Sequence, residues 1–340
     1  MNSILELQKA RSTSDGASRH DDVTFVMPIY DRLRFFAHYL DEGLWDGLPL
    51  QIICDGASPA VLDDLHFLTA GRPDIRVHHY ETNRGVACAR GEGMRLVDTP
   101  YLAFCDDDDF LNEADAFLEE STAWMDRDET ILFTAMPAVY AFNESLQIGL
   151  QYDRRGFDGK TGFEVLCYLV ATGEMQVLTL GSLFRPPDLR GTEPEPFFKV
   201  SEDYVFLARL CARYPERRVR VARAGRYMRL VQHQQGSLSG RSGYSLDKIV
   251  MHLVSMCVGA AYLMDMGRLT LPLFTDLLRK RGEVLQTSYT RGRQAAGLVA
   301  DLLAGHDPVA ASDEAAEALR VLERSRDGLP PEFLRLAGWA

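Results

Sequence analysis

Four consecutive aspartates, Asp106 to Asp109, are the residues of this sequence with the clearest capacity for chemistry, and they directly follow an apolar run at 101–105. Neighbouring carboxylates repel one another, and a divalent cation held by hard oxygen ligands relieves that repulsion. Alternate carboxylates such as Asp106 and Asp108 suit Mg²⁺ or Mn²⁺ better than zinc. The alternative is a solvated acidic turn, because runs of like charge are usually hydrated.

A second acidic pair, Glu202 and Asp203, stands at the start of a helix expected over residues 201–213. A hydroxyl group that attacks a carbon centre must lose its proton, and a positioned carboxylate that accepts it typically contributes about 10²–10⁴ in rate. The alternative is a pair of ordinary first-turn acids in a helix capped by Ser201, since the helix dipole favours acids there.

Arginines are concentrated at 209–229, where eight of them accompany a single acid, Glu216. These arginines either form a solvated face and a charged strand, or one or two of them reach a diphosphate. Arg229 is the best placed for a diphosphate. His233 is a candidate third metal ligand, although a lone histidine is more often an ordinary surface or core residue.

The segments that precede the four aspartates alternate between strands and helices. Pro28 stops the first strand, and Ser58 is expected to cap the helix that Pro59 begins. This alternation predicts an α/β fold with a mostly parallel sheet sandwiched by helices. The expected strands are 23–27, 50–54, 75–80 and 101–105, and the expected helices are 32–44, 59–70 and 86–96.

The carboxyl ends of the four strands carry polar, aromatic or glycine residues. Ligands of parallel sheets bind outside these ends, so the four loops could converge on one pocket. The loops are Pro28 to Asp31, Asp55 to Ser58, Thr82 to Gly85 and Asp106 to Asp109. Neither GxGxxG nor GxxxxGK[ST] is present, which disfavours dinucleotide dehydrogenases and P-loop enzymes.

The second half of the chain is expected to change from mixed to helical structure. After a helix at 113–125 we expect a strand at 130–139, a loop at 152–162, a helix at 162–172 and a strand at 177–184. Residues 186–196 contain four prolines and predict an irregular surface loop. From residue 244 the pattern is helical, with breaks expected near Gly267, Gly282 and Gly305, and the apolar run 249–264 predicts a buried helix.

These patterns predict three parts: a leader at 1–21, an α/β domain at 22–240 and a C-terminal all-helical region at 241–340. The C-terminal helices could form a homodimer, shape an acceptor site or dock on a partner. The net charge of −12 argues against a nucleic-acid partner, because phosphate backbones need a cationic surface. Six scattered cysteines without a CxxC pair and a polar N-terminus predict a cytoplasmic protein, with peripheral attachment to the inner face of a membrane left open.

Five short motifs fall in an order and spacing that resemble the GT-A glycosyltransferases of family 2, over about residues 22–240. The motifs are Val26-x-Pro28-x-Tyr30, Asp55 with Ser58, Asn83-x-Gly85 followed by Ala89-Arg90, Asp106-x-Asp108-Asp109, and Glu202-Asp203. Each motif stands at an expected strand end or helix start. The resemblance implies a GT-A fold, a nucleotide-sugar donor and inversion at the anomeric carbon.

The resemblance also implies roles for individual residues. Asp108 would ligate Mg²⁺ or Mn²⁺, Asp106 would approach the ribose or the metal, and Asp203 would be the general base. The residues implied or expected at the nucleotide sugar are Pro28, Tyr30, Asp55, Arg84, Arg90, Asp106, Asp107 and Arg229. The acceptor would be a carbohydrate, a lipid-linked molecule or another compound that bears a hydroxyl group. The family pattern is altered at Asp31, Gly56 and Gly91, which leaves the identity of the base open.

Three other functions were weighed against an inverting, metal-dependent glycosyltransferase. A catalytically silent module that binds sugar nucleotides or carbohydrates would share the donor site and lack the base. A nucleotidyltransferase would need a glycine-rich loop with a lysine after the first strand, where the sequence reads Pro28 to Arg32. A metal-dependent phosphatase would need a lysine and an acid downstream of the four aspartates at a suitable spacing.

Overall fold

The structure is a computed structural model that describes residues 20–142, 148–173, 178–230, 245–288, 292–306 and 312–339. The chain divides into two compact units, which are described separately below. Unit 1 comprises Met1–Gly162, Gln176–Gly191 and Glu216–Gln232, and unit 2 comprises Phe163–Met175, Thr192–Pro215 and His233–Ala340. This division differs from the predicted boundary at residue 240, because two segments from the middle of the chain group with the C-terminal helices.

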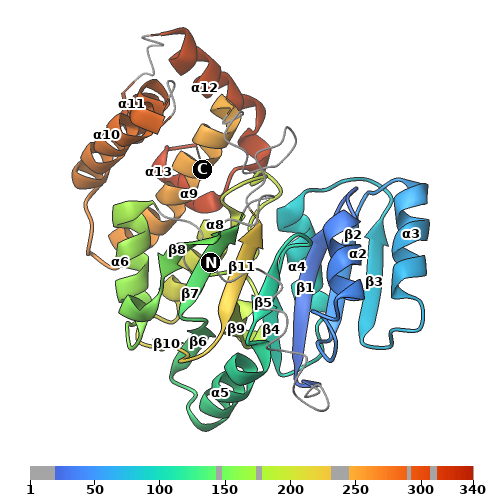
Figure 1. The fold of residues 1–340 in the computed structure, drawn as a ribbon. Coiled ribbons are helices and arrows are strands. Elements are labelled where there is room, and N and C mark those ends of the chain that lie inside the picture. Colours follow the sequence, from blue (N-terminus) through green and yellow to red (C-terminus); the bar gives the residue numbers. More distant parts are fainter. Residues whose placement is uncertain are drawn as a thin grey trace. The chain divides into compact units, whose positions relative to one another are not determined.

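The core of unit 1 is a seven-stranded sheet of order β10-β6-β9-β4-β1-β2-β3. Strands β1, β2, β3 and β4 are parallel neighbours, as the alternating pattern predicts, and β9 runs antiparallel between β4 and β6. Figure 1 shows β1, β2 and β3 side by side. The strands are β1 Val23–Ile29, β2 Leu50–Asp55, β3 Ile75–Tyr80, β4 Tyr101–Phe104, β6 Ile131–Ala135, β9 Ser182–Phe184 and β10 Arg218–Val221.

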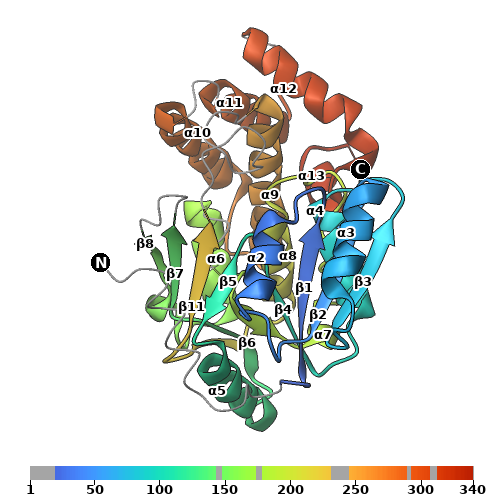
Figure 2. The ribbon, with the colours of Figure 1, turned by 45° about the vertical axis from the view of Figure 1, so that its right-hand side comes forward.

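Four helices of unit 1 follow the predicted positions closely. They are α2 Arg34–Asp41, α3 Pro59–Thr69, α4 Val86–Leu96 and α5 Ala114–Arg127. The short α7 Pro186–Leu189 was not predicted. Ser58 caps α3 as expected, since its hydroxyl accepts a hydrogen bond from Val61 N at 3.4 Å. In the view of Figure 2, α3 lies in front of β2. Helix α4 packs on β1 and β2 so closely that a Cβ on Gly93 would lie 2.2 Å from Val26 Cγ1.

A second sheet of unit 1 has the order β5-β11-β7-β8. Its strands are β5 Phe110–Asn112, β7 Ala138–Phe142, β8 Ile148–Asp153 and β11 Arg226–Leu230. The single strand expected at 130–139 is therefore wrong, because β6 belongs to the first sheet and β7 to the second. Pro137 separates them, and since proline has no amide hydrogen it cannot continue the ladder of β6.

Two further expectations in unit 1 need correction. The proline-rich loop begins with α7, because Pro186 and Pro187 occupy first-turn positions where a missing amide hydrogen costs nothing. The strand expected at 177–184 is reduced to β9, preceded by an isolated bridge between Leu180 and Phe104, and residue 177 lies outside the described residues. The loop expected from 152 to 162 starts with the last residues of β8.

Unit 2 is helical, as predicted for the C-terminal region. Its helices are α6 Gly162–Thr172, α8 Glu202–Arg213, α9 Leu246–Asp265, α10 Leu271–Ser288, α11 Gly292–Leu303, α12 Asp313–Arg324 and α13 Pro331–Leu336. Figure 2 shows α10 and α11 side by side. Gly267 and Gly305 adopt positive φ angles just beyond α9 and α11, which confirms two of the expected breaks. The break expected at Gly282 is wrong, because α10 runs through it and a glycine inside a helix costs only about 1 kcal/mol.

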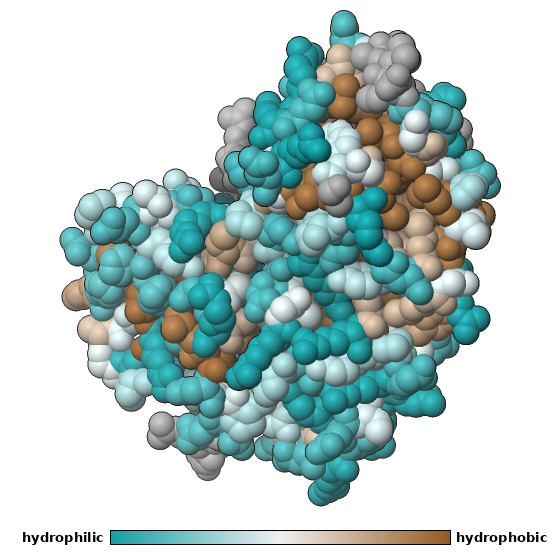
Figure 3. All heavy atoms as spheres, turned by 180° about the vertical axis from the view of Figure 1, so that it is seen from behind, coloured by the Kyte–Doolittle hydropathy of each residue, from teal (hydrophilic) through white to brown (hydrophobic). Residues whose placement is uncertain are grey.

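Helix α9 is the core of unit 2. It is long and apolar enough to cross a membrane by length and composition, but 83% of its most apolar window is buried inside the structure. The prediction of a buried helix at 249–264 is therefore confirmed. Figure 3 shows one face of the molecule, on which apolar groups gather in the upper part. Leu273 of α10, at 60% exposed, is the most exposed large apolar side chain among the described residues of unit 2.

Candidate active site

The acidic loop, defined as Asp106 to Asp109, connects β4 to β5 at the carboxyl end of the first sheet. The backbone amide of Asp109 donates to Asp106 O at 3.2 Å, which closes the loop into a turn. Asp109 Oδ1 accepts a hydrogen bond from Leu230 N of β11 at 2.9 Å, and Tyr39 of α2 donates its hydroxyl to Asp108 O at 3.1 Å. Three elements therefore hold the loop in one conformation.

The carboxyl groups of Asp107, Asp108 and Asp109 have raised pKa values. Burial, together with the charges of Asp108 and Asp106, raises the pKa of Asp107 to about 8. Burial and the charge of Asp106 raise the pKa of Asp108 to about 6, and burial with its acidic neighbours raises the pKa of Asp109 well above its usual range. Arg32 opposes the first two shifts. Such shifts indicate that burial and repulsion among the carboxylates outweigh the nearby positive charges.

Asp106, Asp108 and Asp109 form a candidate metal centre. One carboxylate oxygen from each lies within 4.8 Å of the other two. Asp109 is 1% exposed, and its Oδ2 is buried with no hydrogen-bond partner in the described part of the chain. An unpartnered buried carboxylate oxygen is costly, and a hard divalent cation would satisfy it. The residues present therefore fit Mg²⁺ or Mn²⁺.

The predicted ligands Asp106 and Asp108 are brought together by this arrangement, and Asp109 joins them. His233, the third predicted ligand, lies outside the described residues. Asp109 was missed as a ligand, although the sequence holds a signal. It directly precedes the apolar β5, so it was the aspartate of the four most apt to be drawn into the core.

Two predicted arginines lie next to the acidic loop. Arg90 of α4 is 6% exposed and its Nη2 lies 2.7 Å from Asp106 Oδ1 in an ion pair. Burial alone would lower the pKa of Arg229, but the charges of Asp109 and Asp106 raise it above the usual value. Both arginines are thus positively charged beside the carboxylates. Arg32, which the sequence analysis left out, contributes a third positive charge.

Asp55 has a structural task. Its Oδ1 accepts from Arg84 N at 2.7 Å and its Oδ2 from Gly85 N at 2.8 Å, so both oxygens fix the loop after β3. The turn after β2 is equally tight, since a Cβ on Gly56 would lie 2.0 Å from Asn83 N. The guanidinium of Arg84 stacks over the ring of Tyr80 at 4.7 Å. The implied contact between Asp55 and a base stays a prediction.

Pro28 and Tyr30 lie at the carboxyl end of β1. Pro28 aligns with Ile53 in the parallel pairing of β1 with β2. Tyr30 is 49% exposed, so it is not a core aromatic, and its ring is accessible to a ligand. An exposed aromatic face at a strand end suits stacking on a planar base.

Glu202 and Asp203 belong to unit 2 and occupy the first turn of α8. They are 8% and 7% exposed, which is unusual for first-turn acids on a solvated face. The expected cap by Ser201 is wrong, because this residue adopts a left-handed conformation with φ 68° and its side chain makes no capping hydrogen bond. The role of Asp203 as a base stays a prediction.

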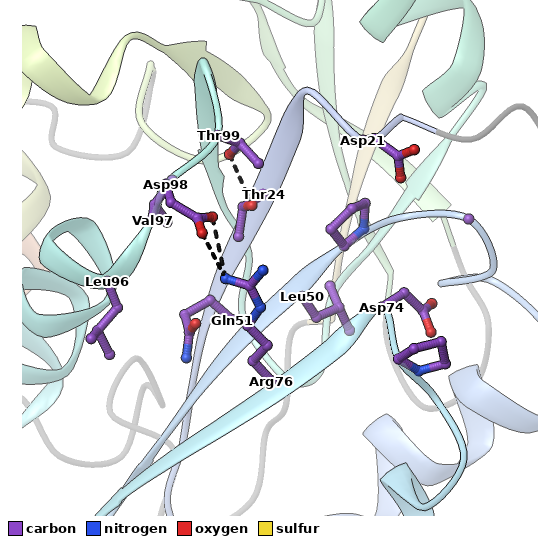
Figure 4. Close-up of a pocket in the computed structure, with 13 residues that line it drawn as sticks. Asp21, Thr24, Leu50, Gln51, Asp74, Arg76, Leu96, Val97, Asp98 and Thr99 are labelled. Carbon is purple, nitrogen blue, oxygen red and sulfur yellow. Dashed lines mark hydrogen bonds and ion pairs between the residues drawn. The ribbon is translucent and has the colours of Figure 1, made fainter.

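A cavity of about 450 Å³ lies at the opposite, amino end of β1 to β4. Figure 4 shows the side chains around it, including Gln51 of β2 and the ion pair between Arg76 and Asp98. Thr99 donates to Thr24 Oγ1 at 2.9 Å across the same cavity. Its arginine and its threonines are already partnered, and no predicted site residue lines it.

A comparison with known protein families matches the part of the chain that carries the acidic loop. Residues 24–166 match the family model described as "Glycosyl transferase family 2". This part of the chain is similar to family 2 glycosyltransferases. The matched segment contains the acidic loop and the ends of β1 to β4, and it confirms the predicted family and enzyme class. No curated protein matches the chain.

The solved structures that resemble this glycosyltransferase include TarS of S. aureus. One TarS structure matches with a TM-score of 0.56 at 14% identity, over 93% of this chain and 55% of that chain. TarS 1-349 in complex with UDP matches with a TM-score of 0.56 at 13% identity, over 93% of this chain and 90% of that one. TarS 1-349 in complex with UDP-GlcNAc matches with a TM-score of 0.51 at 15% identity, over 91% of this chain and 93% of that one. These likenesses confirm the predicted fold, and the chain spans only 55% of the longer TarS structure.

Proposed function

We propose that this glycosyltransferase moves a sugar from a nucleoside-diphosphate sugar to an acceptor hydroxyl in a single, inverting, metal-dependent displacement. The observation that carries the proposal is the cluster of Asp106, Asp108 and Asp109, with one oxygen of Asp109 buried and unpartnered. The TarS structures in complex with UDP and UDP-GlcNAc support a donor of the same class.

The donor side of the reaction is assigned to unit 1. Asp106, Asp108 and Asp109 would hold Mg²⁺ or Mn²⁺, which when bound stabilises the negative charge that develops on the departing diphosphate. Arg90 and Arg229 add positive charge to the same region, which disfavours loss of the diphosphate to solvent. Tyr30 offers its exposed ring to the base.

The acceptor side is assigned to Asp203. The carboxylate would take the proton of the attacking hydroxyl, and a single base on the face opposite the leaving group produces inversion in one step. Glu202 is its neighbour in the first turn of α8. We further propose a carbohydrate, a lipid-linked molecule or another hydroxyl compound as acceptor, a cytoplasmic location and a homodimer through the C-terminal helices, on the sequence alone.

A thermal-shift screen of nucleoside diphosphates and their sugars, with and without Mn²⁺, tests the donor assignment. A ligand at 100 times its Kd stabilises the folded protein by about 2.7 kcal/mol, which is a readily measured shift. We expect at least one nucleoside diphosphate to raise the melting temperature, and to do so more strongly with Mn²⁺. No shift with any of them in the presence of Mn²⁺ would refute the donor site.

The same screen, together with an assay of sugar transfer, separates the enzyme from a silent binding module. Asp203→Asn should keep the donor-induced shift and lose sugar transfer, because the base is needed only for the chemical step. A module without activity would give no transfer with the wild-type protein under any acceptor, and Asp203→Asn would change nothing.

A further inference from the structure

Arg154 is a buried cation that lacks the partners such a residue normally has. It follows β8 in unit 1 and is 0% exposed. Its Nη1 donates to Gly181 O at 3.5 Å, the outer limit of a hydrogen bond. Its Nε and Nη2 are buried and have no hydrogen-bond partner among the described residues.

The surroundings of Arg154 do not balance its charge. Burial lowers the pKa of Arg154 to about 9, and the groups that oppose this shift are two phenols, Tyr227 and Tyr152, rather than carboxylates. Burying an unpaired charge is strongly unfavourable, and an apolar residue of similar volume at such a position is often neutral or stabilising. The fold alone therefore gives no reason for an arginine here.

Arg185 shows how unit 1 treats an arginine that has a structural task. Its Nη1 donates to Ile131 O at 2.7 Å, and its Nη2 donates to Met125 O at 2.6 Å and to Asp128 O at 3.1 Å. These three carbonyls tie the end of α5 to the start of β6. The guanidinium of Arg185 thus donates to backbone carbonyls, whereas two side-chain nitrogens of Arg154 have no acceptor among the described residues.

Short contacts connect Arg154 to the acidic loop. Gly181, which accepts its one hydrogen bond, lies against Tyr227, since a Cβ on Gly181 would be 2.9 Å from the tyrosine side chain. The hydroxyl of Tyr227 in turn accepts a hydrogen bond from Asp106 N at 3.3 Å. Arg154 is therefore connected to the first aspartate of the loop through Gly181 and Tyr227.

The two arginines that interact with Tyr227 differ in their charge balance. Arg229 lies two residues after Tyr227 on β11, and the charges of Asp109 and Asp106 act on it. No carboxylate is among the charges that act on Arg154. An anion that enters this region would meet one arginine already engaged by aspartates and one that is not.

We propose that Arg154 binds a phosphate oxygen of the nucleoside diphosphate, and that its two unpartnered nitrogens are kept for that anion. This inference rests on the proposed function and assigns a residue to its leaving group. The planar guanidinium can offer two parallel N–H donors to one phosphate group, which makes arginine better suited than lysine to this task. Because Arg154 is 0% exposed, its side chain must turn past Tyr227 to reach a diphosphate.

The test compares Arg154→Met with Arg185→Met in the full chain, with Mn²⁺ present. The melting temperature is measured for the free proteins, and calorimetry gives the affinity for UDP and for inorganic pyrophosphate. We expect Arg154→Met to be at least as stable as the wild type and to bind both ligands about tenfold more weakly or worse, as is typical for a lost hydrogen bond to a charged group. Arg185→Met should be less stable and bind both ligands normally.

Two results would overturn the inference. Arg154→Met could lose stability as Arg185→Met does and retain wild-type affinity, which would make Arg154 a structural residue, or it could change neither property. Should Arg154→Met not fold, Arg154→Lys keeps the charge without the fork and must bind pyrophosphate more weakly than the wild type while melting at a similar temperature. Failure of the wild-type protein to bind any nucleoside diphosphate would instead refute the proposed function.

Discussion

Two clusters of buried charge, one in each unit, are built in opposite ways. In unit 2, Arg209 donates from Nε and Nη2 to Glu332 at 3.0 Å each, from Nη2 to Glu195 Oε1 at 2.6 Å and from Nη1 to Glu193 O at 2.6 Å. Tyr262 adds a hydrogen bond to Glu332 Oε1 at 2.7 Å. In unit 1, the carboxylates of the acidic loop outnumber the cations beside them. Asp109 Oδ2 and two nitrogens of Arg154 have no hydrogen-bond partner among the described residues.

The difference separates a charge cluster that stabilises the fold from one that serves ligands. Burial alone would lower the pKa of Arg209, but its bonds to Glu332 and Glu195 raise it above the usual value. Burial instead raises the pKa of Asp107 and Asp108, and their acidic neighbours raise it further. A folded chain retains such an unfavourable group where function requires it. Substitutions in unit 2 should therefore cost stability, and those in the acidic loop should cost binding.

The largest effect on stability is expected from Arg209→Met in unit 2. The change leaves Glu332 and Glu195 buried without their cation, and breaking a buried ion pair on one side costs about 3–5 kcal/mol. Urea denaturation measures the loss. Arg335→Met is the control, because its pair with Asp265 is about half exposed and worth about 1 kcal/mol at most. A loss for Arg209→Met no larger than for the control would contradict the comparison.

Asp107→Asn, in unit 1, should increase stability rather than decrease it. Because the pKa of Asp107 is raised to about 8, folding at pH 7 must return to this carboxyl a proton that the unfolded chain has released. A neutral asparagine avoids that cost, so we expect the metal-free protein to gain about 1 kcal/mol of stability in EDTA at pH 7. Because Asp107 lies outside the three-aspartate cluster, Mn²⁺ binding should persist. A destabilised variant would mean that the loop carboxylates are better compensated than the structure indicates.

The pH dependence of stability should reveal how much Glu332 of the unit 2 cluster contributes to stability. Burial would raise the pKa of Glu332, but hydrogen bonds from Arg209 and Tyr262 lower it below its usual value. A lowered folded-state pKa stabilises the protein above the unfolded-state pKa of about 4.3, and this contribution is lost as the pH falls through the folded-state pKa. Glu332→Gln should therefore be less stable than wild type at pH 7, with the difference shrinking below about pH 4 in acid titrations of urea stability. A difference that is constant with pH would refute this assignment.

Much of unit 1 was predictable because its signals are local. The strand and helix spacing up to Phe104 predicts β1 to β4 and α2 to α4 within a few residues, and Ser58 caps its helix as expected. The separation of β6 from β7 at Pro137 could not be predicted, because the two strands join different sheets and local sequence patterns do not indicate which sheet a strand joins. The left-handed Ser201 is likewise fixed by tertiary packing rather than by capping propensity.

The sequence predicts the residue types of the candidate site better than it predicts how their side chains are arranged. The sequence indicates a cation at the four aspartates, but their alternation suggests Asp106 with Asp108. The apolar residues that follow Asp109 are the one local sign that its carboxylate turns inward, where it accepts from Leu230 N. Arg154 carried no signal at all, because an isolated arginine after a strand is usually solvated. Its importance comes only from the missing partners that the folded structure exposes.

The smallest expected effect comes from Tyr39→Phe. The change keeps the ring contact with Phe110, 5.3 Å between centroids, and deletes the hydrogen bond from the Tyr39 hydroxyl to Asp108 O. Loss of one such bond costs about 1 kcal/mol, so Mn²⁺ affinity should fall about fivefold with little change in overall fold. Tyr101→Phe, which removes a hydroxyl bonded to Asp126 elsewhere in unit 1, should leave Mn²⁺ affinity unchanged. Equal effects of the two variants would show that Tyr39 does not position the loop.

The central claim is that the acidic loop holds a divalent cation which in turn holds the diphosphate. Calorimetric titration of Mn²⁺ into the wild-type protein and into Asp108→Asn, each followed by UDP, tests it most directly. The account predicts that the wild type binds Mn²⁺ and then UDP, and that Asp108→Asn binds both at least about tenfold more weakly, because a charged ligand atom is lost. Equal Mn²⁺ and UDP affinities in the two proteins would contradict it.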